Sequence, residues 1–279
     1  MLDLKQIETF YPENLRIFKR NLLREYLQYV ILDIIYSSGY GSRLIFMGGT
    51  AIHMIHGVRR FSEDLDFDNR GLKKEDFEDL SGKILRQLEL YGYSVEIQNR
   101  YGGAFHCFVK FPGIFYQHGI SGHSREKLTI QIDCEPQNVN YKAERVILNK
   151  FDIFMKINAV PPDILLAQKI LAVLYRSRPM GRDFYDVIFL FSKTNPNYHY
   201  LKKKMKLKEE TEIEKIKKKL LLKCEKINFE KLAEDVKPFL FYPHDAEKIM
   251  LFPDFIKTKM LNTWFQRRFQ FKLYNFIYK

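Results

Sequence analysis

The stretch LIFMGGTAIHMIHGVRRFSEDLDFD, residues 44–68, decides the fold of this 279-residue chain. Its apolar start predicts a short strand, and the glycine pair that follows predicts a tight turn into an amphipathic segment ending at Gly57. After a spacer of thirteen residues from Thr50, the alternating string Asp64-Leu65-Asp66-Phe67-Asp68 predicts a second strand.

Asp64 and Asp66 share one face of that second strand, because successive side chains of a strand point to opposite sides. Two carboxylates this close repel each other unless a cation lies between them. Mg²⁺, with Mn²⁺ as the alternative, prefers such oxygen ligands and recruits substrate phosphates to complete its shell. The N–H groups of Gly48 and Gly49, with the Thr50 hydroxyl, can meet those phosphates. The pattern favours transfer of a nucleotidyl group.

Gly-Gly-Thr, the spacer and Asp-x-Asp resemble the first motif of the DNA-polymerase-β-like nucleotidyltransferase superfamily. Within it, GGTAIH followed by RRFSEDLDF is similar to the AbiEii/AbiGii-type toxins of type IV toxin–antitoxin and abortive-infection systems. Arg60, Ser62, Asp64 and Asp66 fill the matching positions, and Ile52 replaces a leucine.

A second block, PPDILLAQKILAVLYRSRPMGRDFYDVIFL at residues 161–190, resembles the same family's helix with a lysine, an arginine and an Arg-Asp-x-x-Asp-Leu motif. Val187 replaces the final leucine. The two blocks stand in the family's order and span roughly half the chain. The matching residues are Lys169, Arg176, Arg182, Asp183 and Asp186.

The resemblance implies an α/β (α+β) fold, with a nucleotidyltransferase domain over residues 1–158 built on a small mixed sheet, and a mainly helical, basic domain over 159–279. A nucleoside triphosphate (NTP) is expected in the cleft between them. The resemblance also implies a toxin that adds nucleotides to the 3′ end of tRNA, blocks translation and is neutralised by a separately encoded antitoxin. The expected metal ligands are Asp64, Asp66 and Asp133, and the expected nucleotide-binding residues are Gly48, Gly49, Thr50, Arg60, Ser62, Lys169 and Asp183.

Asp133 ends the predicted strand 128–133 on its polar face, with Thr129 and Gln131. This position resembles the superfamily's third acid, which joins the metal cluster or takes a proton from the incoming hydroxyl. The alternative is an ordinary strand-end aspartate that caps the following turn. Glu135 is the nearby substitute for the role.

Lys169 lies in an apolar helical stripe, so its ammonium needs a partner or water, because an unpaired buried charge is costly. A triphosphate is one such partner, and a structural salt bridge or exposure of the side-chain tip is the alternative. Asp183 and Asp186 share a helix face and either act in catalysis, with Asp186 the stronger candidate, or cap the helix and orient the lysine.

Several other side chains have two readings. Ser62 either bonds a phosphate or caps its turn. Arg59 and Arg60 are expected to neutralise substrate charge, with solvation of the loop as the alternative for one of them. His53 and His56 lack a third metal ligand nearby and are read as structural.

Charge divides unevenly along the chain. Residues 1–150 hold 20 Lys/Arg against 19 Asp/Glu, and residues 151–279 hold 26 against 15, so the second half carries +11 of the net +12. This excess suits a polyanion such as RNA. The interleaved acids of residues 202–226 equally fit a solvated helix. In residues 251–279, basic and aromatic side chains alternate, including Trp264, Phe265, Arg267, Arg268, Phe269, Phe271 and Tyr274, and either grip nucleic acid or pack on the core.

The three cysteines have unrelated spacings and predict free thiols in a reducing, cytoplasmic setting. No apolar run approaches the length of a membrane span, so no membrane partner is expected. Two other functions stay open: nucleotidyl transfer to a small molecule or protein hydroxyl, and nucleic-acid or partner binding on a catalytically dead scaffold.

Overall fold

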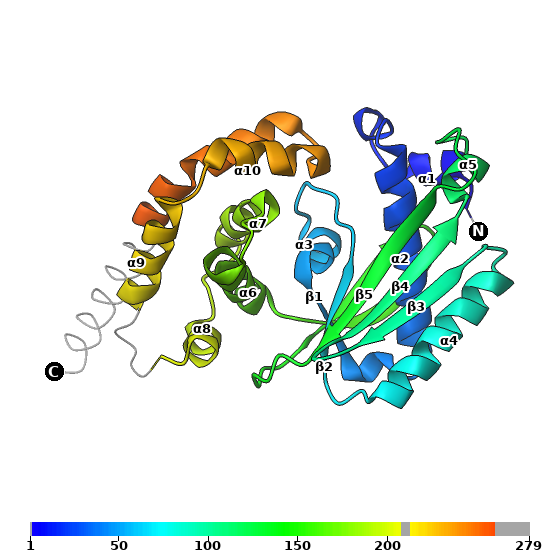
Figure 1. Ribbon diagram of the computed structural model, residues 1–279, viewed down its shortest axis with the longest axis horizontal. Helices are drawn as coiled ribbons and strands as arrows, with labels where there is room; N and C mark the ends of the chain where they lie inside the picture. The colour runs from blue at the N-terminus through cyan, green and yellow to red at the C-terminus, as the bar shows by residue number, and fades with distance from the viewer. Residues whose placement is uncertain (1, 208–212, 260–279) are drawn as a thin grey trace, which may run out of the picture. The chain divides into compact units, whose positions relative to one another are not determined.

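The computed structural model describes residues 2–207 and 213–259, and the chain forms two compact units, Met1–Pro161 and Pro162–Lys279. Unit 1 is an α/β body, and unit 2 is helical (Figure 1). This confirms the predicted α/β class.

Unit 1 is built on a seven-stranded mixed sheet with the order β3-β4-β5-β2-β1-β7-β6. β2 runs parallel to β5, and β1 runs parallel to β7, while the other neighbours are antiparallel. The strands are β1 (Leu44–Met47), β2 (Leu65–Asn69), β3 (Glu96–Tyr101), β4 (Phe105–Pro112), β5 (Lys127–Glu135), β6 (Glu144–Lys150) and β7 (Ile153–Ala159).

One face of this sheet is the core face. Alternating apolar side chains such as Phe46, Phe67 and Ile132 point to it and are completely buried. Helix α2 (Lys19–Ser37) packs on β7 and β5, and α4 (Lys74–Leu90) packs on β3 and β4. The helices therefore leave the polar side chains of the same strands on the opposite face. Shorter elements of unit 1 are α1 (Leu4–Thr9), η1 (Glu13–Leu15), η2 (Gly41–Arg43), α3 (Gly48–His56) and α5 (Ile114–Gln117).

Several element boundaries differ from the sequence-based expectation. The apolar spacing from Pro12 to about Ser38 predicts one helix, but the structure has a short 3₁₀ turn, η1, followed by α2, which begins at Lys19. Residues 113–125 are rich in Gly, His and Ser and predict a loop, which in the structure contains the helical turn α5. Strands β6 and β7 were not anticipated, because each has one exposed face and mixes charged with apolar residues.

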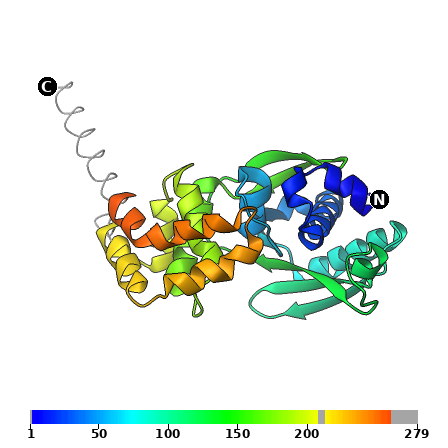
Figure 2. The ribbon, with the colours of Figure 1, turned by 90° about the horizontal axis from the view of Figure 1, so that it is seen from above.

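Unit 2 is an assembly of helices (Figure 2), and aromatic side chains from several of them contact one another. Phe184 contacts Phe252 and Phe229, with ring centroids 4.8 Å and 5.7 Å apart. The described helices are α6 (Pro162–Tyr175), α7 (Gly181–Phe191), α8 (Tyr198–Met205), α9 (Ile213–Cys224), α10 (Phe229–Val236), η4 (Lys237–Phe239) and η5 (Pro243–Leu251).

The basic and aromatic segment from Trp264 to Tyr274 lies outside the described residues. None of the helices described in residues 2–207 and 213–259 has both the length and the apolar composition needed to cross a bilayer. The cysteines Cys107, Cys134 and Cys224 are free and buried.

Candidate active site

The glycine turn joins β1 directly to helix α3. Gly48 opens the helix with a φ of +76°, a conformation that side chains disfavour. A Cβ at Gly48 would stand 2.0 Å from Oδ2 of Asp66, so the missing side chain makes room for that carboxylate. The side chain of the N-cap residue Met47 makes no capping hydrogen bond, and the backbone N–H groups of the first turn of α3 and the helix dipole together favour an anion there.

Thr50 connects this turn to the first aspartate. Its side chain is fully buried, and its hydroxyl donates a hydrogen bond to the backbone oxygen of Asp64. The side chain therefore fixes the position of Asp64, while the backbone N–H of Thr50 belongs to the first turn of α3.

Arg60 and Ser62 line the other side of the turn. A Cβ at Gly49 would stand 2.7 Å from Nη2 of Arg60 and 3.1 Å from Oγ of Ser62. Arg60 is 1% exposed, and its Nη1 donates to the Phe61 oxygen at 3.0 Å. Nε2 of Gln28, on α2, donates to the backbone oxygen of Ser62 at 3.3 Å. The buried guanidinium adds fixed positive charge beside the glycines.

The third carboxylate lies on the neighbouring strand. β2 and β5 pair in parallel with Asp66 opposite Asp133, so both side chains are on the polar face of the sheet. Nδ1 of His106, on β4, lies 2.7 Å from Oδ1 of Asp133. Gln131 donates from Nε2 to the same oxygen at 2.7 Å and to Oδ2 at 3.0 Å.

Sequence reasoning missed His106. Its link to Asp133 depends on the antiparallel register of β4 and β5, in which the two residues are direct partners. The alternation of polar and apolar residues in both strands was the available signal, but it does not supply the register.

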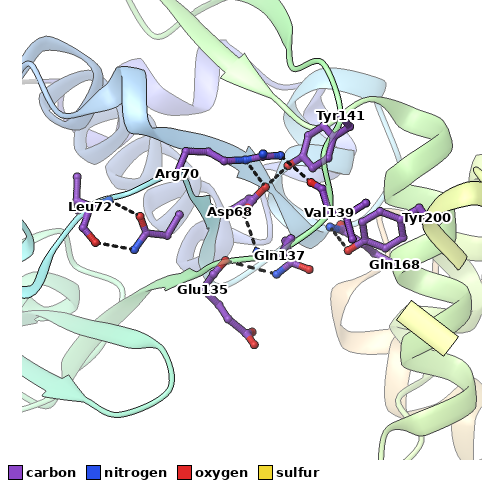
Figure 3. A network of polar contacts seen from close by, with 10 residues as sticks. Asp68, Arg70, Leu72, Glu135, Gln137, Val139, Tyr141, Gln168 and Tyr200 are labelled. Atoms are coloured by element: carbon purple, nitrogen blue, oxygen red, sulfur yellow. Dashed lines mark hydrogen bonds and ion pairs between the residues drawn. The ribbon is translucent and has the colours of Figure 1, made fainter. Parts of the chain in front are cut away.

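Asp68 follows the Asp-x-Asp pair and serves a different purpose. Its side chain is 1% exposed, and it accepts from the Gln137 N–H at 2.8 Å and from Arg70 Nε at 2.8 Å (Figure 3). The Tyr141 hydroxyl donates to the same carboxylate, and the Arg70 guanidinium lies 4.3 Å from the centre of the Tyr141 ring. Asp68 therefore anchors the chain that leaves β5 beyond Asp133.

The residues present fit a divalent metal that takes most of its ligands from water and substrate phosphates. The described part of the chain holds no group of three His, Cys, Asp or Glu side chains gathered as a metal site. Mg²⁺ does not need one, because one or two carboxylates, water and substrate phosphates can complete its octahedron. Asp64 and Asp66 are half-buried and provide such oxygens.

Unit 2 holds the second block of predicted residues. Nζ of Lys169 lies 2.9 Å from Asp183 and 2.9 Å from Asp186, and both carboxylates are almost fully buried. Arg176 pairs with the other oxygen of Asp183 at 2.9 Å. The two aspartates thus hold Lys169 in place through the kind of salt bridge that was the alternative to phosphate contact. Arg182 lies over the ring of Phe239. Phosphate contact by Lys169 stays a prediction.

His53, on α3, bonds to α2 and to the segment that follows its own helix. Nε2 of His53 is 3.0 Å from Oε2 of Glu25 on α2, and its Nδ1 is 3.0 Å from the Val58 oxygen. Lys150 pairs with the second Glu25 oxygen at 2.7 Å. Burial favours a higher pKa for Glu25, but His53 and Lys150 outweigh it and lower the pKa to about 2.

Comparison with solved structures defines the class of fold. Protein JHP933 from Helicobacter pylori superposes with a TM-score of 0.53 at 16% identity, over 89% of this chain and 96% of that chain. A proposed nucleotidyltransferase from H. pylori gives a TM-score of 0.52 at 16% identity, over 87% and 96%. The chain shares its fold with these two structures, and none of the curated proteins compared with the chain matches it.

The family model for the nucleotidyl transferase AbiEii toxin of type IV toxin–antitoxin systems matches residues 30–269. The chain belongs to this family and is a nucleotidyltransferase, which confirms the class of enzyme predicted from the two sequence blocks. Membership of a type IV system implies an NTP substrate and an antitoxin partner.

Proposed function

We propose that the protein is a Mg²⁺-dependent toxin that transfers a nucleoside monophosphate from an NTP to the 3′ hydroxyl of an RNA, with tRNA as the acceptor. The observation that carries this proposal is the packing of the Asp66 carboxylate against Gly48, at the helix N-terminus that favours phosphate. Carboxylates for a metal and donors for a triphosphate are thereby side by side within unit 1.

Each group then has a defined task. Asp64 and Asp66 hold the metal, which supplies positive charge to the reacting phosphates when bound. The N–H groups of Gly48, Gly49 and Thr50, with the Ser62 hydroxyl and the charge of Arg60, hold the phosphates beyond the reacting one. Within unit 2, Asp183 and Asp186 orient Lys169 for the phosphate contact that the sequence predicts.

The reaction is an in-line displacement at the α-phosphate. The acceptor oxygen forms a bond to that phosphorus, the bond to the β-phosphate oxygen breaks, and pyrophosphate leaves. Asp133, beside Asp66 in the sheet, is assigned either as a further metal ligand or as the acceptor of the hydroxyl proton. An RNA bearing the added nucleotide at its 3′ end is expected to be unable to support translation.

The test is to incubate the protein with total RNA, Mg²⁺ or Mn²⁺ and each labelled NTP in turn. Wild type should label RNA, and Asp66→Asn should reduce labelling at least about a hundred-fold, because it removes one charged metal ligand without changing side-chain size. Asp152→Asn is the matched control, since Asp152 is exposed at the β6–β7 turn and its φ of +59° suits asparagine.

Circular dichroism should show that both variants keep the fold. If a protein or a small molecule is labelled and RNA is not, the acceptor is a protein or small-molecule hydroxyl and the proposed RNA acceptor is wrong. Absence of any labelled product with all four NTPs would favour the non-catalytic binding role.

A further inference from the structure

The polar face of the sheet continues from the aspartates towards the edge strand β6. β6 and β7 pair with Arg145 opposite Asn158 and Ile147 opposite Lys156. Their alternate residues, such as Leu148, are buried on the core face. We name the residues on the polar face of these two strands the β6–β7 face. Its residues are Arg145, Ile147, Asn149, Phe154, Lys156 and Asn158.

Large apolar side chains stand uncovered on this face. Phe154 is 71% exposed and Ile147 is 58% exposed. They belong to neighbouring register positions, because Phe154 pairs with Asn149, two residues after Ile147. An aromatic ring this exposed contributes little to the core, and it offers a flat surface to a ligand.

Cations surround the two apolar side chains. Lys142, Arg145 and Lys156 are exposed, and within the described ranges none of them forms an ion pair with an acidic side chain. Other cations of unit 1 do pair with acids, as Lys83 does with Asp79 at 2.9 Å. The β6–β7 face therefore carries positive charge that the protein itself does not neutralise.

A pocket of about 1080 Å³ adjoins the face and contains two of its residues, Arg145 and Asn158. This volume is large enough for a nucleotide. Glu144 is the one acid among the residues that line it. The full lining is Ser42, Ile45, Lys142, Ala143, Glu144, Arg145, Asn158 and Pro161.

The pocket is linked to the candidate active site through the sheet. Ile45, in its wall, is the register partner of Asp68, and Met47 is the partner of Asp66. Neighbouring strands are about 4.8 Å apart, so the backbone of Asn158 on β7 lies about 10 Å from that of Asp68 on β2. The nucleotides that precede an RNA 3′ end held at Asp66 can therefore reach the pocket.

We propose that the β6–β7 face and its pocket bind the single-stranded 3′ end of the acceptor RNA. Arg145, Lys156 and Lys142 contact its phosphates, and one base stacks on Phe154. This inference rests on the proposed function. It adds where on the protein the acceptor RNA binds and that the bound segment is single-stranded. It assigns the terminal nucleotides to unit 1, although most of the net charge lies in the second half of the chain.

RNA explains the face better than a protein partner does. Lysine is depleted in protein–protein interfaces, whereas basic side chains interleaved with an aromatic are typical of sites for single strands. Addition of a peptide strand along β6 is also disfavoured, because its charged residues Glu144, Arg145 and Lys150 oppose edge pairing.

The test measures binding without catalysis. A fluorescein-labelled, twelve-nucleotide single-stranded RNA is titrated with the full chain in the absence of NTP and Mg²⁺, and anisotropy gives the Kd. Arg145→Gln with Lys156→Gln should weaken binding ten-fold or more. The dependence of log Kd on log salt should become shallower by roughly 1.4, because two phosphate contacts are lost.

Two further variants isolate stacking. Phe154→Leu should weaken binding about five-fold or more, and Phe154→Tyr should bind as wild type, because tyrosine keeps the ring. The matched charge control is Lys83→Gln with Arg86→Gln on α4, which packs on the other face of the sheet. It changes net charge equally and should leave the Kd within about two-fold.

The outcomes separate this inference from the proposed function. Asp66→Asn should keep the RNA affinity and lose transfer, and the face variants should raise the KM for RNA more than they lower kcat. Unchanged Kd values for the face variants would overturn the inference and leave the face to a protein partner. An equal loss in the α4 control would also overturn it. Tight RNA binding by wild type with no transfer of any nucleotide would refute the proposed function alone.

Discussion

At the scale of single residues, both the backbone conformation of Gly48 and its contact with a candidate metal ligand require glycine. Its positive φ and its contact with Asp66 both exclude a side chain. Gly57 ends the same helix with the same φ of +76°, but a Cβ there would meet no atom within 4 Å. A substitution at Gly57 therefore tests backbone strain alone, and the same substitution at Gly48 tests backbone strain together with displacement of the Asp66 carboxylate.

We predict that Gly48→Ala loses at least about a hundred-fold in nucleotide transfer, because the new methyl group displaces a proposed metal ligand. Gly57→Ala should lose about 1 kcal/mol of stability to backbone strain and keep its activity. Transfer assays and urea unfolding of both variants provide the measurement. Full activity of Gly48→Ala would show that the position of Asp66 next to the turn does not matter for transfer.

The candidate residues differ in how far the sequence predicts them. Asp64, Asp66 and the glycines are close in sequence, so a local pattern suffices to place them together. Asp133 comes beside Asp66 only through a parallel pairing of strands more than sixty residues apart. The burial of Asp68 depends on the later chain folding over it, which alternation alone cannot reveal.

At the scale of elements, the close approach of α7 to α10 depends on Gly181. A Cβ at this position would stand 2.1 Å from the backbone oxygen of Leu232. The N–H of Gly181 also donates to Asp235 of α10 at 2.9 Å. The two helices thus make contact through backbone atoms, which do not adjust as a flexible side chain would.

Gly181→Ala is therefore expected to destabilise unit 2 by about 1–3 kcal/mol, the usual cost of overpacking. Gly82→Ala in α4 is the matched control, because its nearest neighbour is the tip of Arg86 at 3.4 Å. It should stabilise the protein by up to about 1 kcal/mol through helix propensity. Thermal unfolding of both variants measures the difference, and equal effects at the two sites would contradict the proposed backbone contact.

Helices and strands were predictable from the sequence where the apolar residues follow a single helical or strand period. The pattern predicts a helix over residues 72–91 and strands over 93–99, 104–111 and 128–134, and α4, β3, β4 and β5 match these ranges to within a few residues. The β6–β7 hairpin was not predicted, because its outer face presents Ile147 and Phe154 where solvent-facing residues are normally polar. That departure from simple alternation coincides with the surface assigned to RNA, as functional demands on a strand can override its patterning.

At the scale of the whole molecule, Glu25 ties together three distant parts of unit 1. It joins α2 to α3 through His53 and to the end of β6 through Lys150. Its pKa is lower in the folded protein than its ordinary value of 4.5. The folded state therefore binds fewer protons, and this contribution to stability is present above about pH 4.5 and lost as the pH falls towards 2.

Glu25→Gln should thus lower stability near neutral pH by about 3 kcal/mol, because it leaves His53 and Lys150 without their buried carboxylate. Between pH 4.5 and 2 its stability should depend less on pH than that of wild type. Urea unfolding across this range tests both points, with Glu89→Gln, an exposed residue of α4, as the control. A wild-type-like pH profile for Glu25→Gln would refute the linkage.

The confined space at Gly48 has a genetic consequence. Every single-base change in the first two positions of a glycine codon introduces either a residue with a Cβ or a stop. A cell that loses the antitoxin gene is expected to survive by inactivating this enzyme, and every missense change in the first two positions of codon 48 adds a Cβ next to Asp66. Among survivors with missense mutations, substitutions at codon 48 should therefore be more frequent than at codon 57, where a Cβ meets no atom within 4 Å.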